Sequence, residues 1–123
     1  MKVQGIELAW IVVNDVEKAI KFYTEVVGLH LCEFSKEYGW AELAGPSGSR
    51  LGIATASKET DVKAGANAVV TICVDDIDKA RAEFSKKKVH LVGDIIEVPG
   101  HVKMQTFKDS DGNTFQLCQM LGL

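Results

Sequence analysis

The chain has few of the residues that mark a chemical site or a cross-linked fold. Its three cysteines, Cys32, Cys73 and Cys118, are odd in number and widely spaced, with no C-x-x-C pair. Each lies in an apolar strand pattern, so we expect reduced, buried, small apolar side chains. This cysteine usage favours a cytoplasmic location.

The chain also lacks a large excess of charge of either sign and long apolar runs. The net charge is −3, and the only basic run, Lys86-Lys87-Lys88, ends a predicted helix, where cations favour the helix dipole. No apolar run is long enough to cross a bilayer, and the N-terminus lacks the features of a signal peptide. We therefore expect neither a nucleic-acid partner nor a membrane partner.

Sequence motifs of common active sites are missing as well. There is no Ser-His-Asp arrangement, Gly-rich phosphate loop or H-E-x-x-H motif. His30 and His90 are expected at the surface. His101 follows Pro99-Gly100 in a predicted loop, where it is either a general base or ligand contact, or a solvated loop histidine.

What the chain does contain is an internal repeat. The stretch from Val13 to Ala19 (V-N-D-V-E-K-A) returns from Val74 to Ala80 (V-D-D-I-D-K-A), at a constant offset of 61 residues. An apolar strand precedes each copy and an amphipathic helix follows it. Two copies suggest a duplicated module rather than a solenoid.

Local signals predict the same element order, β-α-β-β-β, in each half. Asp15 and Asp76 are placed as helix N-caps, and Gly28 as the left-handed residue that ends the first helix. The predicted strands are 6–13, 29–34, 39–44, 50–54, 66–74, 90–98, 102–108 and 114–119. The expected domain organisation is a first module at 1–56, a linker at 57–65 and a second module at 66–123, in one compact domain.

The expected class is therefore α+β. Two such modules are expected to form a curled, cup-shaped mixed sheet with the helices on the outside. A concave and mostly apolar interior is the default ligand site.

The chain resembles the vicinal oxygen chelate superfamily, which includes glyoxalase I, extradiol dioxygenases and bleomycin-resistance proteins. The resemblance rests on V-x-D-x-x-K-A-I-x-F-Y-x-x-V-x-G-L at 13–29, the second V-D-D-I-D-K-A, and D-x-D-G-N at 109–113. Together these motifs span essentially the whole chain. The resemblance also implies a homodimer.

The resemblance implies a divalent metal held by the first and last strand of each module. The corresponding positions here are Leu8, Gly52, Val69 and Gln116. Three of these side chains cannot bind a metal, and glutamine is a weak neutral ligand. A slip of one residue would bring in Glu7, but period two turns it outward. We therefore expect no metal and no cofactor.

Period-two alternation predicts which side chains face the cup. These are Ile6, Leu8, Trp10, Val12, Asn67, Val69, Thr71, Cys73, Thr114, Gln116 and Cys118, with Trp40, Glu42, Met104 and Thr106 added by pairing across the hairpins. From them, and from the family positions, comes the candidate ligand-binding set Leu8, Trp10, Trp40, Glu42, Gly52, Val69, Thr71, Met104, Thr106 and Gln116.

The polar and aromatic members of this set each have two interpretations. Trp10 and Trp40 either stack on a planar or cationic ligand or simply fill the core. Glu42 is either a buried acid or base with a raised pKa or a solvated carboxylate at a strand edge. Gln116 either orients a polar ligand or pairs with Thr71 or backbone groups.

The function most consistent with this inventory is binding of a small-molecule ligand without a metal, by sequestration, as in the bleomycin-binding branch. The alternative is a glyoxalase-like lyase, isomerase or thiol transferase with a non-standard or metal-free site, in which Glu42 or His101 performs acid–base chemistry. A regulatory ligand sensor is a third possibility, and fold alone does not decide among them.

Overall fold

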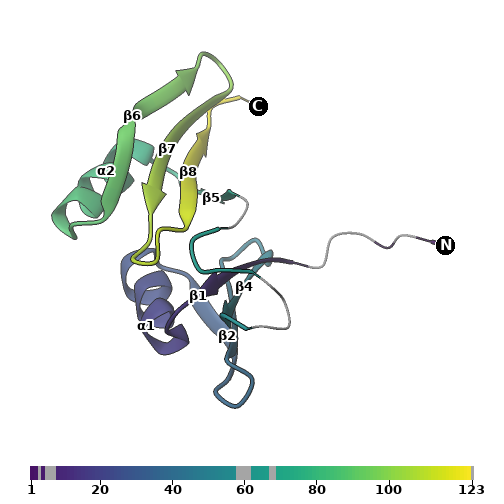
Figure 1. Ribbon diagram of the computed structural model, residues 1–123. Coiled ribbons are helices and arrows are strands. Elements are labelled where there is room, and N and C mark those ends of the chain that lie inside the picture. Colours follow the sequence, from purple (N-terminus) through teal and green to yellow (C-terminus); the bar gives the residue numbers. More distant parts are fainter. Residues whose placement is uncertain (3, 5–7, 58–61, 67–68, 123) are drawn as a thin grey trace. The chain divides into compact units, whose positions relative to one another are not determined.

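The structure, a computed structural model, describes residues 1–123 apart from 3, 5–7, 58–61, 67–68 and 123. The chain divides into two compact units, Met1–Ala66 and Asn67–Leu123. Each unit contains one strand, one helical segment and three further strands, in that order (Figure 1). The α+β class and the repeated β-α-β-β-β module predicted from the sequence are confirmed.

The first unit builds a four-stranded mixed sheet. Its strands are β1 (Ala9–Val13), β2 (His30–Ser35), β3 (Trp40–Ala44) and β4 (Arg50–Thr55). They follow the order β1-β4-β3-β2, with β1 parallel to β4 and the other pairs antiparallel. The parallel pair places the first strand of the module at one edge of the sheet, beside the last strand.

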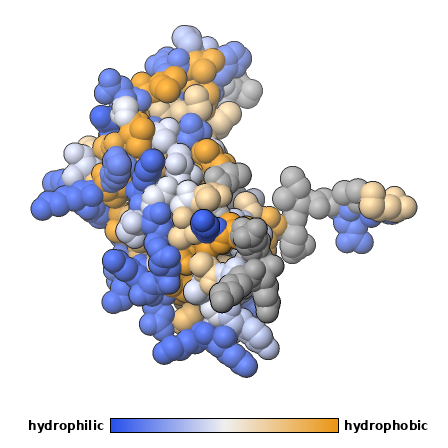
Figure 2. Space-filling model, viewed as in Figure 1, coloured by the Kyte–Doolittle hydropathy of each residue, from blue (hydrophilic) through white to orange (hydrophobic). Residues whose placement is uncertain are grey.

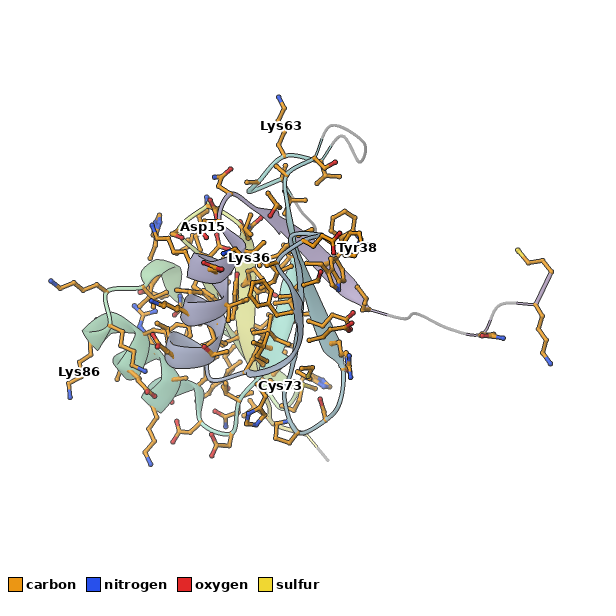
Figure 3. The ribbon with its side chains drawn as sticks, turned by 90° about the horizontal axis from the view of Figure 1, so that it is seen from below. Asp15, Lys36, Tyr38, Lys63, Cys73 and Lys86 are labelled. Atoms are coloured by element: carbon orange, nitrogen blue, oxygen red, sulfur yellow. The ribbon has the colours of Figure 1, made fainter. Side chains whose placement is uncertain are left out.

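A helical segment covers one face of this sheet and joins β1 to β2. It begins as α1 (Val16–Lys21), where Asp15 Oδ1 accepts the Lys18 amide at 3.2 Å, and continues as the π-helix η1 (Phe22–Val26). Gly28 follows with a φ of +95°, the left-handed conformation predicted for it. Asp15 lies at the start of the helix in Figure 3.

The core of the first unit lies between this helix and the sheet. On the side of the sheet that faces the helix, the fully buried strand residues include Ile11, Val13, Ala41, Leu43 and Ile53. From the helical side, Ala19 and Tyr23 are also buried. The intervening strand residues therefore point to the opposite face, which carries no helix of this unit.

The second unit repeats this plan. Its elements are β5 (Val70–Cys73), α2 (Ile77–Lys86), β6 (His90–Val98), β7 (Val102–Lys108) and β8 (Thr114–Met120). The strand order is β5-β8-β7-β6, again with the first and last strands parallel.

Aromatic packing holds α2 against its sheet. Asp76 Oδ1 accepts the Lys79 amide at 3.1 Å, which confirms the predicted N-cap. The ring of Phe84 on α2 packs edge-to-face on Phe107, with the ring centroids 5.1 Å apart. Phe107 stacks on Phe115, with the centroids 5.6 Å apart. All three rings are buried, so they form the centre of the second core.

The last hairpins of the two units match as the repeat predicts. Gly48 and Gly112 have φ values of +89° and +85°. In the second hairpin, Asp109 Oδ1 accepts the backbone amides of Asp111 and Asn113 at 3.0 and 2.9 Å. These bonds explain why the D-x-D-G-N sequence forms a tight turn.

The sequence-based predictions differ from the structure at the first strands and at two cysteines. Leu8 precedes β1, and β5 begins only at Val70, whereas Ile6, Glu7 and Asn67 lie outside the described residues. Cys118 is buried, but Cys32 and Cys73 are exposed, so their predicted burial is wrong. Both exposed cysteines lie on edge strands, β2 and β5, and an apolar strand pattern does not show which strands lie at the edge of a sheet.

Part of the surface of the second unit is apolar. Val92, Ile96 and Val98 are exposed on the edge strand β6. Figure 2 shows hydrophobic residues at the surface in the region where β6 and β7 lie in Figure 1. Exposed apolar patches are typical of contact surfaces.

Among the described residues, no helix is long and apolar enough to span a membrane.

Candidate ligand-binding faces

The helix-free face of the first unit carries a row of residues that are direct strand partners. Trp10 on β1 pairs with Gly52 on β4, and Gly52 pairs with Glu42 on β3. Glu42 in turn pairs with Glu33 on β2. The row therefore crosses all four strands, and it joins three residues of the predicted ligand-binding set.

Gly52 lies under the indoles of Trp10 and Trp40. The two rings are 6.2 Å apart at their centroids and tilted by 59°. A Cβ atom added at Gly52 would lie 2.8 Å from Trp40 Cζ2 and 2.9 Å from Trp10 Cβ, and closer still to Trp40 Cη2. Only glycine leaves room for this arrangement. Trp10 keeps 39% of its surface exposed and Trp40 is half-buried, so the pair offers aromatic surface to solvent.

Glu42 anchors Trp40 on this face. Its Oε2 accepts the Trp40 Nε1–H at 3.0 Å, and its Oε1 accepts from Arg50 Nη1 at 2.9 Å. These bonds stabilise the carboxylate form and lower the pKa of Glu42, the Trp40 hydrogen bond most and the Arg50 hydrogen bond next. The hypothesis of a buried Glu42 with a raised pKa is therefore wrong, because both carboxylate oxygens have donors.

The residues do not fit the divalent metal that the family resemblance implies. The side chains of Leu8 and Val69 are apolar, and the indole of Trp40 occupies the space that a ligand side chain at Gly52 would need. Of the four positions that the resemblance assigns to the metal, only Gln116 has a side-chain oxygen that could bind it. In the part of the chain that the structure describes, no group of three or more His, Cys, Asp or Glu side chains could hold a metal ion.

The helix-free face of the second unit carries a row equivalent to the first. Thr71 on β5 pairs with Gln116 on β8, and Gln116 pairs with Thr106 on β7. Thr71 is exposed, whereas Gln116 and Thr106 are half-buried. In this unit the row is neutral and polar, suited to hydrogen bonding rather than to stacking.

Next to this row lies a second row, which contains sulfur. Cys73 pairs with Cys118, and Cys118 pairs with Met104. The Cys73 and Cys118 Sγ atoms are 3.1 Å apart. Met104 belongs to the predicted ligand-binding set, and it is half-buried.

The other predicted residues lie towards the ends of strands. Val69 immediately precedes β5 and is exposed, and Leu8 immediately precedes β1 and is half-buried. His101 is exposed in the turn between β6 and β7. Its amide donates to the Val98 carbonyl and its own carbonyl accepts the Leu121 amide, both at 2.9 Å. The candidate acid–base residues, Glu42 and His101, thus belong to different units.

Two features of these faces were missed from the sequence. Arg50 lies two residues before Gly52 on β4, so period two places it on the same face, but its partner depends on the register of β3 and β4. The Cys73–Cys118 contact depends on the parallel pairing of β5 and β8. The predicted inward face contained both cysteines without pairing them.

Comparison with known proteins supports the fold described here. The family model described as Glyoxalase/Bleomycin resistance protein/Dioxygenase superfamily matches residues 5–117. No curated protein matches the chain.

Three solved structures illustrate the likeness. TnmS3, an antibiotic binding protein from Streptomyces sp. CB03234, is 26% identical, with a TM-score of 0.77 and 98% of each chain covered. A superfamily member from Sphaerobacter thermophilus is 22% identical, with a TM-score of 0.81 and coverage of 95% of this chain and 98% of that one. TioX from Micromonospora sp. ML1 is 17% identical, with a TM-score of 0.74 and coverage of 95% and 100%.

Proposed function

Because the chain belongs to the Glyoxalase/Bleomycin resistance protein/Dioxygenase superfamily, we propose that it binds a small planar or cationic molecule and sequesters it without a metal. The ligand stacks on Trp10 and Trp40 on the helix-free face of the first unit. The corresponding face of the second unit instead carries neutral hydrogen-bonding groups, at Thr71, Thr106 and Gln116.

The observation that carries this proposal is the partly exposed indole pair above Gly52. Aromatic side chains left partly in water lose favourable burial, and stacking on a planar ligand recovers it. The hydrogen bond from Trp40 Nε1 to Glu42 fixes one ring in place before any ligand arrives. A preorganised ring reduces the entropy lost on binding.

The charges on this face favour a cation over an anion. Glu33 and Glu42 are direct partners across β2 and β3, whereas the positive charge of Arg50 is paired with Glu42. An indole face attracts a cation through its quadrupole, and a neighbouring carboxylate adds to that attraction.

The state of Glu42 argues against acid–base catalysis. A carboxylate whose pKa is lowered by hydrogen bonds from Trp40 and Arg50 is ionised at neutral pH and is a weak base. Sequestration needs no proton transfer, and TnmS3, the antibiotic binding protein similar to this chain, sets a precedent for binding.

The test is a titration of the chain's two tryptophans by fluorescence, in the presence of a chelator. Proflavine serves as a planar cation and anthraquinone-2-sulfonate as a planar anion. We expect saturable quenching with proflavine and weaker quenching with the anion. Trp10→Ala should weaken proflavine binding roughly tenfold, equivalent to about 1.4 kcal/mol.

Phe34→Ala provides the matched control. Phe34 is 39% exposed, as Trp10 is, but its partner across the sheet is Ala41, on the helix-covered face. This variant should bind proflavine with unchanged affinity. Equal affinities for wild type and Trp10→Ala, or no saturable binding of either dye, would contradict the proposal.

The predicted homodimer and cytoplasmic location remain part of this proposal. The exposed apolar side chains of β6 supply a surface suited to contact between copies.

A further inference from the structure

The sulfur row of the second unit points to a site that the proposed function does not use. Cys73 and Cys118 are register partners on the parallel strands β5 and β8, and their Sγ atoms lie 3.1 Å apart as free thiols. We propose that Cys73 and Cys118 form an oxidisable dithiol, which a hydroperoxide converts to an intramolecular disulfide.

The backbone geometry permits this bond. Neighbouring strands lie about 4.8 Å apart, within the range of about 4.4–6.8 Å between Cα atoms that disulfides span. Both side chains point to the same face of the sheet, because each is two residues from a member of the Thr71–Gln116 pair. The Sγ atoms need to approach by only about 1 Å to reach bonding distance.

The two cysteines differ in access to solvent, and this difference assigns their roles. Cys73 is exposed, whereas Cys118 is 5% exposed. Burial, followed by the hydrogen bond with Cys73, raises the pKa of Cys118 to about 11. A dissolved oxidant therefore meets Cys73 first, and Cys118 acts as the resolving thiol. Figure 3 marks the position of Cys73.

The reaction balances with the hydroperoxide as the only oxidant. The Cys73 thiolate attacks the terminal peroxide oxygen, the O–O bond breaks, and the alcohol leaves, which makes a sulfenic acid. The Cys118 sulfur then attacks Cys73 Sγ and the S–O bond breaks. The departing hydroxide takes the Cys118 proton and leaves as water. Two thiols have lost two electrons and two protons in total, and the peroxide has been reduced to alcohol and water.

The covalent link would join strands that are 45 residues apart in the sequence. It would lie beside Thr71 and Gln116, on the helix-free face of the second unit. In reducing compartments, disulfides of this kind are usually transient and redox-sensing rather than structural. The disulfide involves neither tryptophan, so its formation can be tested separately from stacking of a ligand on Trp10 and Trp40.

The test uses the full-length, reduced wild-type protein and hydrogen peroxide as the oxidant. After brief oxidation the protein is denatured, alkylated with N-ethylmaleimide and weighed by mass spectrometry. We expect the product to take up one maleimide in place of three and, before alkylation, to lack the mass of two hydrogen atoms. Dithiothreitol should restore all three thiols, and a non-reducing peptide map should join Cys73 to Cys118.

Two variants separate this pair from a general reactivity of the thiols. Cys32→Ser removes an exposed cysteine of the first unit and should leave the Cys73–Cys118 disulfide unchanged. Cys73→Ser changes an exposed side chain, so it should fold, and its Cys118 should remain a thiol. A stable sulfenic or sulfinic acid at Cys73 beside a free Cys118, or full alkylation of all three cysteines, would overturn the proposal.

Discussion

The two units share one fold but present opposite chemistry at equivalent positions. Trp10, Gly52 and Glu42 in the first unit correspond in register to Thr71, Gln116 and Thr106 in the second. In the neighbouring row, Val12, Ala54 and Trp40 correspond to Cys73, Cys118 and Met104. The two units thus share the backbone plan and a core covered by a helix, and they differ in their helix-free faces. The face of the first unit is aromatic and charged, whereas the face of the second unit is neutral and contains sulfur.

Adding a methyl group at Gly52 should change the free energy of unfolding more than any other substitution that compares the two faces. Gly52→Ala places a Cβ against Trp40 and Trp10, so we expect a loss of about 1–3 kcal/mol in the free energy of unfolding. Gln116→Ala, at the equivalent position, removes a half-buried side chain without such a clash and should cost less. Urea unfolding measures both.

The clash explanation can be separated from a simple loss of glycine flexibility. In a Trp40→Ala background the indole no longer lies over Gly52, and the further cost of Gly52→Ala should shrink. An undiminished cost in that background would show that the indole does not select glycine at this position.

The helix ends offer a second comparison of the two units. Gly28 (φ +95°) ends the first helix, whereas Lys88 (φ +59°) takes the left-handed position after the second. Gly28→Ala should destabilise the protein by about 1 kcal/mol, and Lys88→Gly should stabilise it by about 0.5 kcal/mol, because side chains are disfavoured in this conformation. Thermal unfolding should show shifts in Tm of opposite sign for the two variants. Shifts of the same sign would contradict the account of these two ends.

Glu42→Gln should have the smallest effect on stability and a defined pH dependence. Since folding lowers the pKa of Glu42, its ionised form favours the folded state above pH 4.5, its ordinary value. That contribution should disappear as the pH falls through the lowered folded pKa. The wild type should therefore exceed Glu42→Gln in stability at neutral pH, with the difference vanishing in acid. A difference that grows in acid would reverse the assigned direction of the shift.

The sequence predicts the modules well because their signals are local. Asp15 and Asp76 cap helices, Gly28, Gly48 and Gly112 adopt left-handed turns, and each signal lies within a few residues of its effect. The predicted bounds of β6 and β7 agree with the structure for the same reason.

The contacts between distant strands were harder to predict. The hydrogen bond from Arg50 to Glu42 requires the register of one hairpin, and the Cys73–Cys118 contact requires two parallel strands to pair across 45 residues. Alternation gives the face of each residue but not its partner on the next strand. The exposed state of Cys73 follows from the place of β5 at the edge of its sheet, which the strand pattern alone does not specify.

The most direct test of the proposed aromatic site uses the two indole N–H signals of the chain, which are the only ones its sequence allows. They can be followed by nitrogen–proton NMR during titration with proflavine in the presence of a chelator. We predict that both signals shift with the same saturation curve, since the ring centroids of Trp10 and Trp40 lie 6.2 Å apart on one face. Saturable shifts confined to the second unit, with both indole signals unmoved, would contradict it.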